Sequence, residues 1–167
     1  MKTELKIQNA VGMCKNCFRL RRDGSAYCGQ CKDEPERMKI YMDEQKNFPL
    51  FKKAKKKFPI SETTIFTYGD TIYFDRELPY DLVAHEITHV FQQEKEGVEN
   101  WWDKYFKSKN FRLKQEAEAY HNQYEAVRRN DLVKAAFTLT RNAEELSGKL
   151  YGEIISFEDA KKMIINL

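Results

Sequence analysis

The sequence predicts an α+β fold that is mainly helical and contains a small β-hairpin or sheet. Two C-x-x-C pairs lie near the N-terminus, residues 63–74 are rich in β-branched and aromatic residues, and apolar residues recur at helical spacing from Pro79 onward. The 167 residues, 41% of them hydrophobic, suffice for one domain with a small appendage. We therefore divide the chain into a four-cysteine zinc module (1–33), a basic helical linker (34–60) and a main domain (61–167).

The N-terminal module contains all four cysteines of the chain, which are Cys14, Cys17, Cys28 and Cys31. Two C-x-x-C pairs ten residues apart match a tetrahedral four-thiolate zinc site. Asp23 and Gly24 between the pairs favour a hairpin turn. The pattern predicts a zinc ribbon or knuckle with a structural role, since zinc can supply on the order of 10 kcal/mol to a segment too short for a core. Two disulfides are a weaker interpretation because no export signal precedes them.

The charge pattern gives little information about partners. The formal net charge is only +3, and it makes no strong case for nucleic acid over other partners. Arg19, Arg21 and Arg22 make the cysteine module basic, which could suit nucleic acid or a host protein, although such clusters are more often solvated surface. No run of 18 apolar residues and no secretory signal occur. We therefore expect no membrane contact and a cytoplasmic location.

Residues 34–74 predict two short helical segments and then a hairpin. Glu34–Asp43 is expected to begin a helix, and the lysine-rich segment 51–58 is expected to form an amphipathic turn with its aromatic residues facing the domain. Thr63–Tyr68 and Thr71–Phe74 predict two strands joined by a turn at Gly69 and Asp70.

The segment LVAHEITHVF contains the pattern H-E-x-x-H. On an α-helix, positions i and i+4 lie about 40° apart, so His85 and His89 share a face and could bind one cation together. Glu86 lies about 100° around from His85, which suits a general base acting on water that the metal activates. Pro79 in the first turn and Gly97 at the end bound the predicted helix. The alternative is a chance match, with the histidines as core or surface residues.

A catalytic zinc site needs a third protein ligand and one position for water. The extended pattern with a third histidine fails, because Gln92 and Lys95 occupy its glycine and histidine positions. The helix-forming segment 111–121 contains the candidates, which are Glu116, Glu118 and His121. The alternative is that the glutamates are exposed charges on a helix.

The segments LVAHEITHVFQQ and QEAEAY resemble the gluzincins, the metallopeptidases whose third zinc ligand is a glutamate on a second helix. The chain resembles more closely small zincin-like proteins encoded by phages and prophages, which share the Trp101–Trp102 pair and a segment like Leu150–Gly152. The resemblance covers roughly residues 61–160. It implies a zincin-like metallopeptidase domain, and a bacterial host cytoplasm if the chain is phage-encoded.

The gluzincin pattern E-x-x-A-D maps onto Glu116, Ala119 and Tyr120, so the resemblance implies Glu116 as the third ligand. Tyr120 departs from the pattern, whose aspartate typically orients a ligand histidine. A donor to the oxyanion of the transition state is also expected. Tyr120, His121 and Tyr124 are candidates for it by position, although core packing suits Tyr124 better and a surface role suits His121 better.

The remaining segments are expected to be helical or to pack on the core. The aromatic residues of segment 101–106 could line a substrate cleft or pack a loop onto the core, and the second is favoured. Residues 125–146 are expected to continue as helix, with Val127, Leu132, Ala135, Ala136 and Leu139 available for burial. Ser156 is expected to cap a last helix over 157–165, with Asp159 in the capping box.

These patterns together predict a zinc-dependent metallopeptidase of the gluzincin type, with one catalytic and one structural zinc ion and a protein or peptide substrate. His85, His89 and Glu116 would bind the catalytic ion, and Glu86 would be the general base. One alternative is a catalytically weak or inactive zincin that works as a protein- or nucleic-acid-binding module. Another is a peptidase that the cysteine module delivers to its targets by binding DNA.

Overall fold

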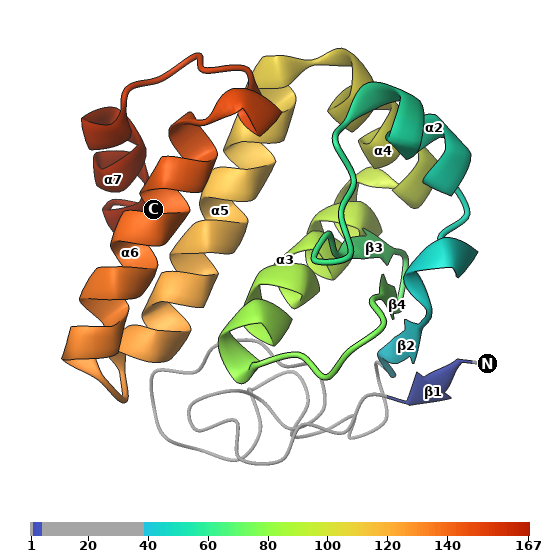
Figure 1. Ribbon diagram of the computed structural model, residues 1–167, viewed down its shortest axis with the longest axis horizontal. Coiled ribbons are helices and arrows are strands. Elements are labelled where there is room, and N and C mark those ends of the chain that lie inside the picture. Colours follow the sequence, from blue (N-terminus) through green and yellow to red (C-terminus); the bar gives the residue numbers. More distant parts are fainter. Residues whose placement is uncertain (1, 5–38) are drawn as a thin grey trace.

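A computed structural model describes residues 2–4 and 39–167 of the chain (Figure 1). Over these residues the fold is α+β and mainly helical, as the sequence predicts, with 64% of them in helices. The predictions for the four-cysteine module lie outside the described residues. None of the described helices combines the length and the apolar run that crossing a bilayer requires.

The four-stranded sheet has the order β1-β2-β4-β3. Its strands are β1 (Thr3–Glu4), β2 (Tyr41–Asp43), β3 (Phe66–Tyr68) and β4 (Thr71–Tyr73). β2 and β4 are parallel, whereas the two outer pairs are antiparallel. β3 and β4 form the predicted hairpin, and Gly69 in its turn has a φ of 60°, which a glycine adopts without strain. β3 is therefore an edge strand of the sheet.

The prediction of a helix over Glu34–Asp43 is wrong for residues 41–43, which form β2. Helix propensity is a weak preference, and here pairing with β4 and burial of Ile40 outweigh it. The predicted linker, 34–60, is described from residue 39 onward. β2, the 3-10 turn η1 (Gln45–Asn47) and α2 (Phe51–Lys57) all pack on the main domain, where Phe48 joins an aromatic core. Ala54 of α2 is fully buried and its lysines are exposed, as the amphipathic pattern predicts.

The helical part follows the sheet in sequence. Its elements are α3 (Tyr80–Glu96), α4 (Val98–Lys107), α5 (Lys109–Arg128), α6 (Leu132–Ser147), η2 (Lys149–Tyr151) and α7 (Phe157–Ile165). α5 lies between α3 and α6, and α7 packs on α5 and α6 (Figure 1). The sheet and α4 flank α3 on its other sides. α3 is thus the central helix, with β3 against one face and α5 against another.

The bounds of α3 agree with the prediction to within one residue. Pro79 is the cap that precedes the first turn, and Gly97 ends the helix with a φ of 84°. α7 begins as predicted, with the Ser156 side chain accepting a hydrogen bond from the Asp159 N–H.

The predicted continuous helix over 125–146 is wrong, because the chain breaks between α5 and α6. Asp131 caps α6 by accepting from the Lys134 N–H, and this cap starts a new helix with a new phase. Leu132 is consequently 72% exposed and Ala136 is exposed, although the sequence pattern makes both available for burial. Val127, Ala135 and Leu139 are buried as expected.

Three apolar clusters position the site. One lies between the sheet and α3 and includes Ile72 and Ile87. A second lies between α5, α6 and α7 and includes Leu146. The third is aromatic and includes Phe66 and Trp101. The segment 101–106, predicted as a loop, belongs to helix α4, and its tryptophans pack in this aromatic cluster.

Candidate metal centre

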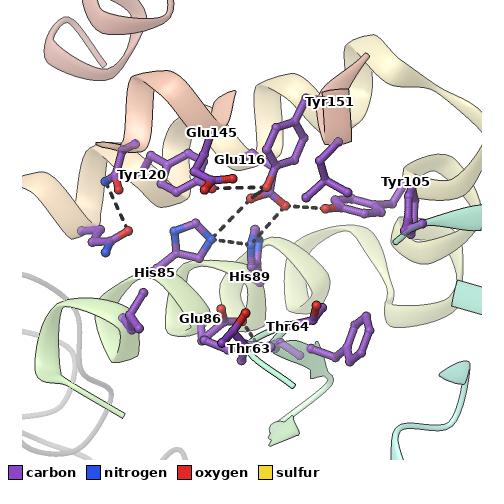
Figure 2. A pocket seen from close by; sticks show the side chains of 18 of the residues that line it. Thr63, Thr64, His85, Glu86, His89, Tyr105, Glu116, Tyr120, Glu145 and Tyr151 are labelled. Carbon is purple, nitrogen blue, oxygen red and sulfur yellow. Dashed lines mark hydrogen bonds and ion pairs between the residues drawn. The ribbon is translucent and has the colours of Figure 1, made fainter. Parts of the chain in front are cut away.

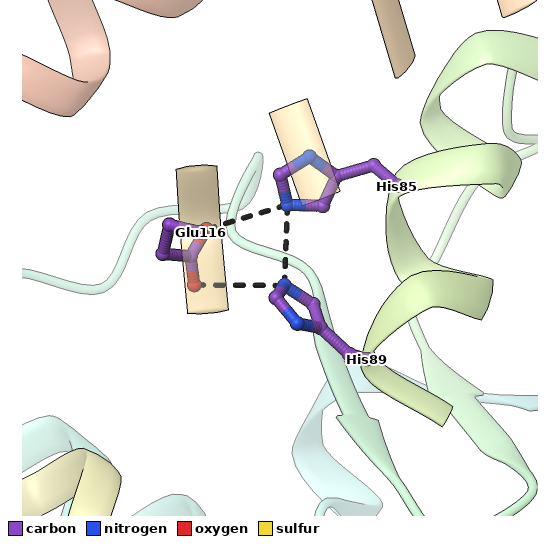
Figure 3. Close-up of side chains that lie close together, drawn as sticks. All are labelled: His85, His89 and Glu116. Atoms are coloured by element: carbon purple, nitrogen blue, oxygen red, sulfur yellow. Dashed lines mark hydrogen bonds and ion pairs between the residues drawn. The ribbon is translucent and has the colours of Figure 1, made fainter. Parts of the chain in front are cut away.

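Two histidines of α3 and one glutamate of α5 converge where these helices pack together (Figure 3). The Nε2 atoms of His85 and His89 are 3.2 Å apart. Glu116 presents one carboxylate oxygen 3.4 Å from His85 Nε2 and the other 3.5 Å from His89 Nε2. All three side chains are buried, and the group could hold a metal ion.

The spacing of the two imidazole nitrogens fits a tetrahedral zinc ion. With zinc–nitrogen and zinc–oxygen bonds of about 2.0–2.1 Å, two ligand atoms of a tetrahedral site are roughly 3.3–3.4 Å apart. The two Nε2 atoms, 3.2 Å apart, lie close to this value, and each imidazole has a different oxygen of Glu116 at a similar distance, 3.4 Å for His85 and 3.5 Å for His89. The donor set of two imidazoles and one carboxylate also occurs in catalytic zinc sites, which leave one position open.

The charges of the group are strongly coupled. Burial alone would lower the pKa of His89, but the adjacent Glu116 carboxylate outweighs it and raises the pKa to about 9. Burial would likewise raise the pKa of Glu116, but the two histidines hold it well below its usual range. The group thus carries opposite charges at neutral pH in protein stripped of metal, and a metal ion would replace the proton on His89.

We expect metal-free protein to lose folding stability as the pH rises from about 6.5 to about 9. The pKa of His89 rises from the ordinary histidine value of 6.5 to about 9 in the fold, so its protonation stabilises the fold fully below 6.5. This stabilisation disappears as the pH rises through the folded value. Urea unfolding of chelator-treated protein across this range measures the effect, with Glu116→Gln as the comparison. Equal pH profiles for the two proteins would contradict the coupling.

Glu86 lies on α3 beside the two histidines, but it points toward the sheet (Figure 2). Its Oε2 accepts a hydrogen bond of 2.8 Å from the Thr67 hydroxyl of β3. The Thr67 carbonyl in turn accepts from Gln93 Nε2 at 2.8 Å and from Trp102 Nε1 at 3.1 Å. β3 is thus anchored to α3 and α4, and it holds the Glu86 carboxylate in a fixed place.

The group opens into a cavity of about 520 Å³. One wall comes from the segment before and within β3, and another from α4. Polar side chains of α5 and α6 line a further part, and these are Gln123, Arg141, Asn142 and Glu145. The walls otherwise include large aromatic rings, notably those of Trp101 and Phe58. A partly apolar cavity with a few polar groups is typical of a small-molecule or peptide site.

Three tyrosines surround Glu116 in this cavity (Figure 2). Tyr105 donates to Oε1 at 2.6 Å, and Tyr151 donates to Oε2 at 3.0 Å. Burial raises the pKa of both phenols well above the usual value, with the Glu116 charge as the next cause, so both remain donors. The ring of Tyr120 packs edge-on against His85, with centroids 4.6 Å apart. Its hydroxyl lies 3.4 Å from that of Tyr151.

The other sequence candidates lie elsewhere. Glu118 accepts from Gln92 Nε2 at 2.9 Å and is not part of the converging group. His121 Nδ1 lies 2.7 Å from the Ile164 carbonyl of α7. Tyr124 packs in the cluster between α5, α6 and α7. The structure therefore brings Tyr120 into the cavity of Glu116, whereas His121 and Tyr124 do not line it.

Sequence reasoning missed Thr67, Tyr105 and Tyr151. Thr67 lies in the predicted hairpin, but nothing in its neighbours in sequence marks a contact with Glu86. Tyr105 stands out in the sequence only as part of an aromatic group, and Tyr151 only as part of the shared Leu-Tyr-Gly segment.

No family model, curated protein or solved structure matches the chain. The resemblance to gluzincins and to phage-encoded zincin-like proteins therefore stays a prediction.

Proposed function

We propose that the protein is a zinc-dependent metallopeptidase of the gluzincin type. One observation carries this proposal: His85, His89 and Glu116 converge at the spacing of zinc ligands, and Glu86, the neighbour of His85 in the chain, adds a buried carboxylate. The cavity beside them offers room for part of a peptide.

His85, His89 and Glu116 would hold the ion. A bound zinc ion would polarise the scissile carbonyl and lower the pKa of water to about 7. Glu86 takes the proton from the attacking water and then delivers it to the leaving amine. Thr67 occupies Oε2 of Glu86, which leaves Oε1 to accept that proton. The phenol of Tyr120 lines the cavity as a candidate donor to the oxyanion of the tetrahedral transition state, whereas the Tyr151 proton is donated to Glu116.

An extended peptide would lie along the edge of the sheet next to this centre. β3 is an edge strand, and exposed edges can add a peptide as a further strand. The Thr67 carbonyl already accepts from Gln93 and Trp102, so this point of the edge is occupied. The segment 63–65, just before β3, also lines the cavity. The backbone N–H and carbonyl of Thr64 are bonded to Ser61 and Gln45, so we assign Ile65 of this segment to the substrate backbone.

The test is zinc-dependent cleavage of a fluorogenic peptide mixture by the full chain. We expect hydrolysis that stops when a chelator removes zinc and returns when zinc is added back. Protein that holds zinc at the His85–His89–Glu116 group but cleaves no peptide would contradict the proposal and favour the binding module.

A further inference from the structure

Two hydroxyl groups from different parts of the chain hold the carboxylate of Glu116. Tyr105 comes from α4 and bonds to Oε1, whereas Tyr151 comes from η2 and bonds to Oε2. Glu116 and Tyr151 are each 4% exposed. Each carboxylate oxygen therefore receives one phenol proton and also faces one imidazole (Figure 2).

We propose that Tyr105 and Tyr151 are positioning residues that hold Glu116 in the orientation in which it binds the metal ion. This inference rests on the proposed metal centre. A carboxylate has about four lone-pair sites, so it can accept two phenol protons and still bind a cation. A buried carboxylate without such donors would be costly, and its side chain could turn away from the histidines.

The tyrosines are themselves held in place. The ring of Tyr105 stacks on Trp101, with centroids 4.7 Å apart and planes 20° apart. The hydroxyl of Tyr151 is close to that of Tyr120. Their donors are thus fixed before any metal binds, which favours a single geometry for Glu116.

The two histidines differ in the hydrogen bonds of their Nδ1 atoms, which face away from the proposed metal position. The hydrogen bonds to Glu116 therefore matter more for the geometry of the group. His89 Nδ1 lies 2.8 Å from Gln92 Oε1. The buried Nδ1 of His85 has no hydrogen-bond partner among the described residues, and the ring of Tyr120 packs against that imidazole. Orientation of the three ligands therefore depends largely on Gln92 and on the two tyrosines.

The test compares metal affinity in Tyr105→Phe and Tyr151→Phe, which delete only a hydroxyl. Cobalt(II) replaces zinc, and the absorption lost in a His85→Ala/His89→Ala double variant is assigned to this site, separately from the cysteine module. Titration against a chelator of known affinity then gives the dissociation constant. The matched control is Tyr68→Phe, whose tyrosine lies in β3 and does not line the cavity.

We expect each of the two site variants to bind cobalt about 10-fold or more weakly, with an altered absorption spectrum, since loss of an outer contact typically costs 10–100-fold. Tyr68→Phe should match the wild type. Wild-type affinity and spectrum in both site variants would overturn the inference and leave the metal centre intact. Absence of any cobalt signal that depends on the two histidines would overturn the metal centre itself. Urea unfolding of the metal-free variants shows whether each is folded, and the two variants test the inference independently.

Discussion

Glu86→Gln should abolish peptide hydrolysis and leave the metal bound. The amide cannot take a proton from water, so the general base is lost, and such a base typically contributes 10²–10⁴-fold to the rate. The amide oxygen can still accept the hydrogen bond from Thr67, so the local structure should persist. The measurement is kcat on a peptide that the wild type cleaves, together with the zinc content of the variant.

The matched control is Glu94→Gln, which makes the same change on an exposed position of the same helix. It should keep the wild-type rate. Hydrolysis by Glu86→Gln at the wild-type rate would show that Glu86 is not the general base. If the variant instead lost hydrolysis but kept the protein's full biological effect, the binding-module interpretation would gain support.

Glu116→Gln should weaken metal binding at the two histidines by about 100-fold or more. Loss of an outer contact alone typically costs 10–100-fold, and here a charged ligand is removed. The change also removes the charge that raises the pKa of His89. The metal-free variant should therefore lack the extra folding stability that the wild type has at lower pH. Competition titration with cobalt measures the affinity.

Glu118→Gln separates the two glutamates that the sequence leaves as candidates. Glu118 lies two residues further along α5 and bonds to Gln92 rather than facing the histidines. A glutamine there can still accept that bond, so affinity should stay within a few-fold of the wild type. A larger loss of metal affinity in Glu118→Gln than in Glu116→Gln would show that Glu118, and not Glu116, is the third ligand.

Local patterns in the sequence predict the parts of the fold that local interactions determine. Pro79 and Gly97 bound the central helix, and the turn at Gly69 forms the hairpin, because each depends on only a few neighbouring residues. The placement of His85 and His89 on one face also follows from helix geometry alone. Asp131 is a favourable N-cap residue and is the sequence signal for the break between α5 and α6. The helix-forming residues on both sides of it favour an uninterrupted helix and outweigh this signal.

Contacts between distant segments cannot be read in this way. β2 pairs with β4, which lies about thirty residues later in the sequence. A strand of three residues is too short to show a periodic pattern that predicts this pairing. The same holds at the site. The hydroxyls of Thr67, Tyr105 and Tyr151 reach carboxylates that are 19, 11 and 35 residues away in sequence. Only the packing of β3, α4 and η2 around α3 and α5 brings them together.

Diffraction from crystals of the zinc-loaded full chain, recorded on both sides of the zinc absorption edge, would locate each zinc ion directly. We expect an anomalous peak within about 2.0–2.2 Å of His85 Nε2, His89 Nε2 and a Glu116 oxygen, the range of zinc–ligand bonds. We also expect a fourth position there open toward the cavity. The absence of a peak at these three side chains in fully loaded protein, or a fourth protein side chain on the ion, would contradict the proposed hydrolytic centre.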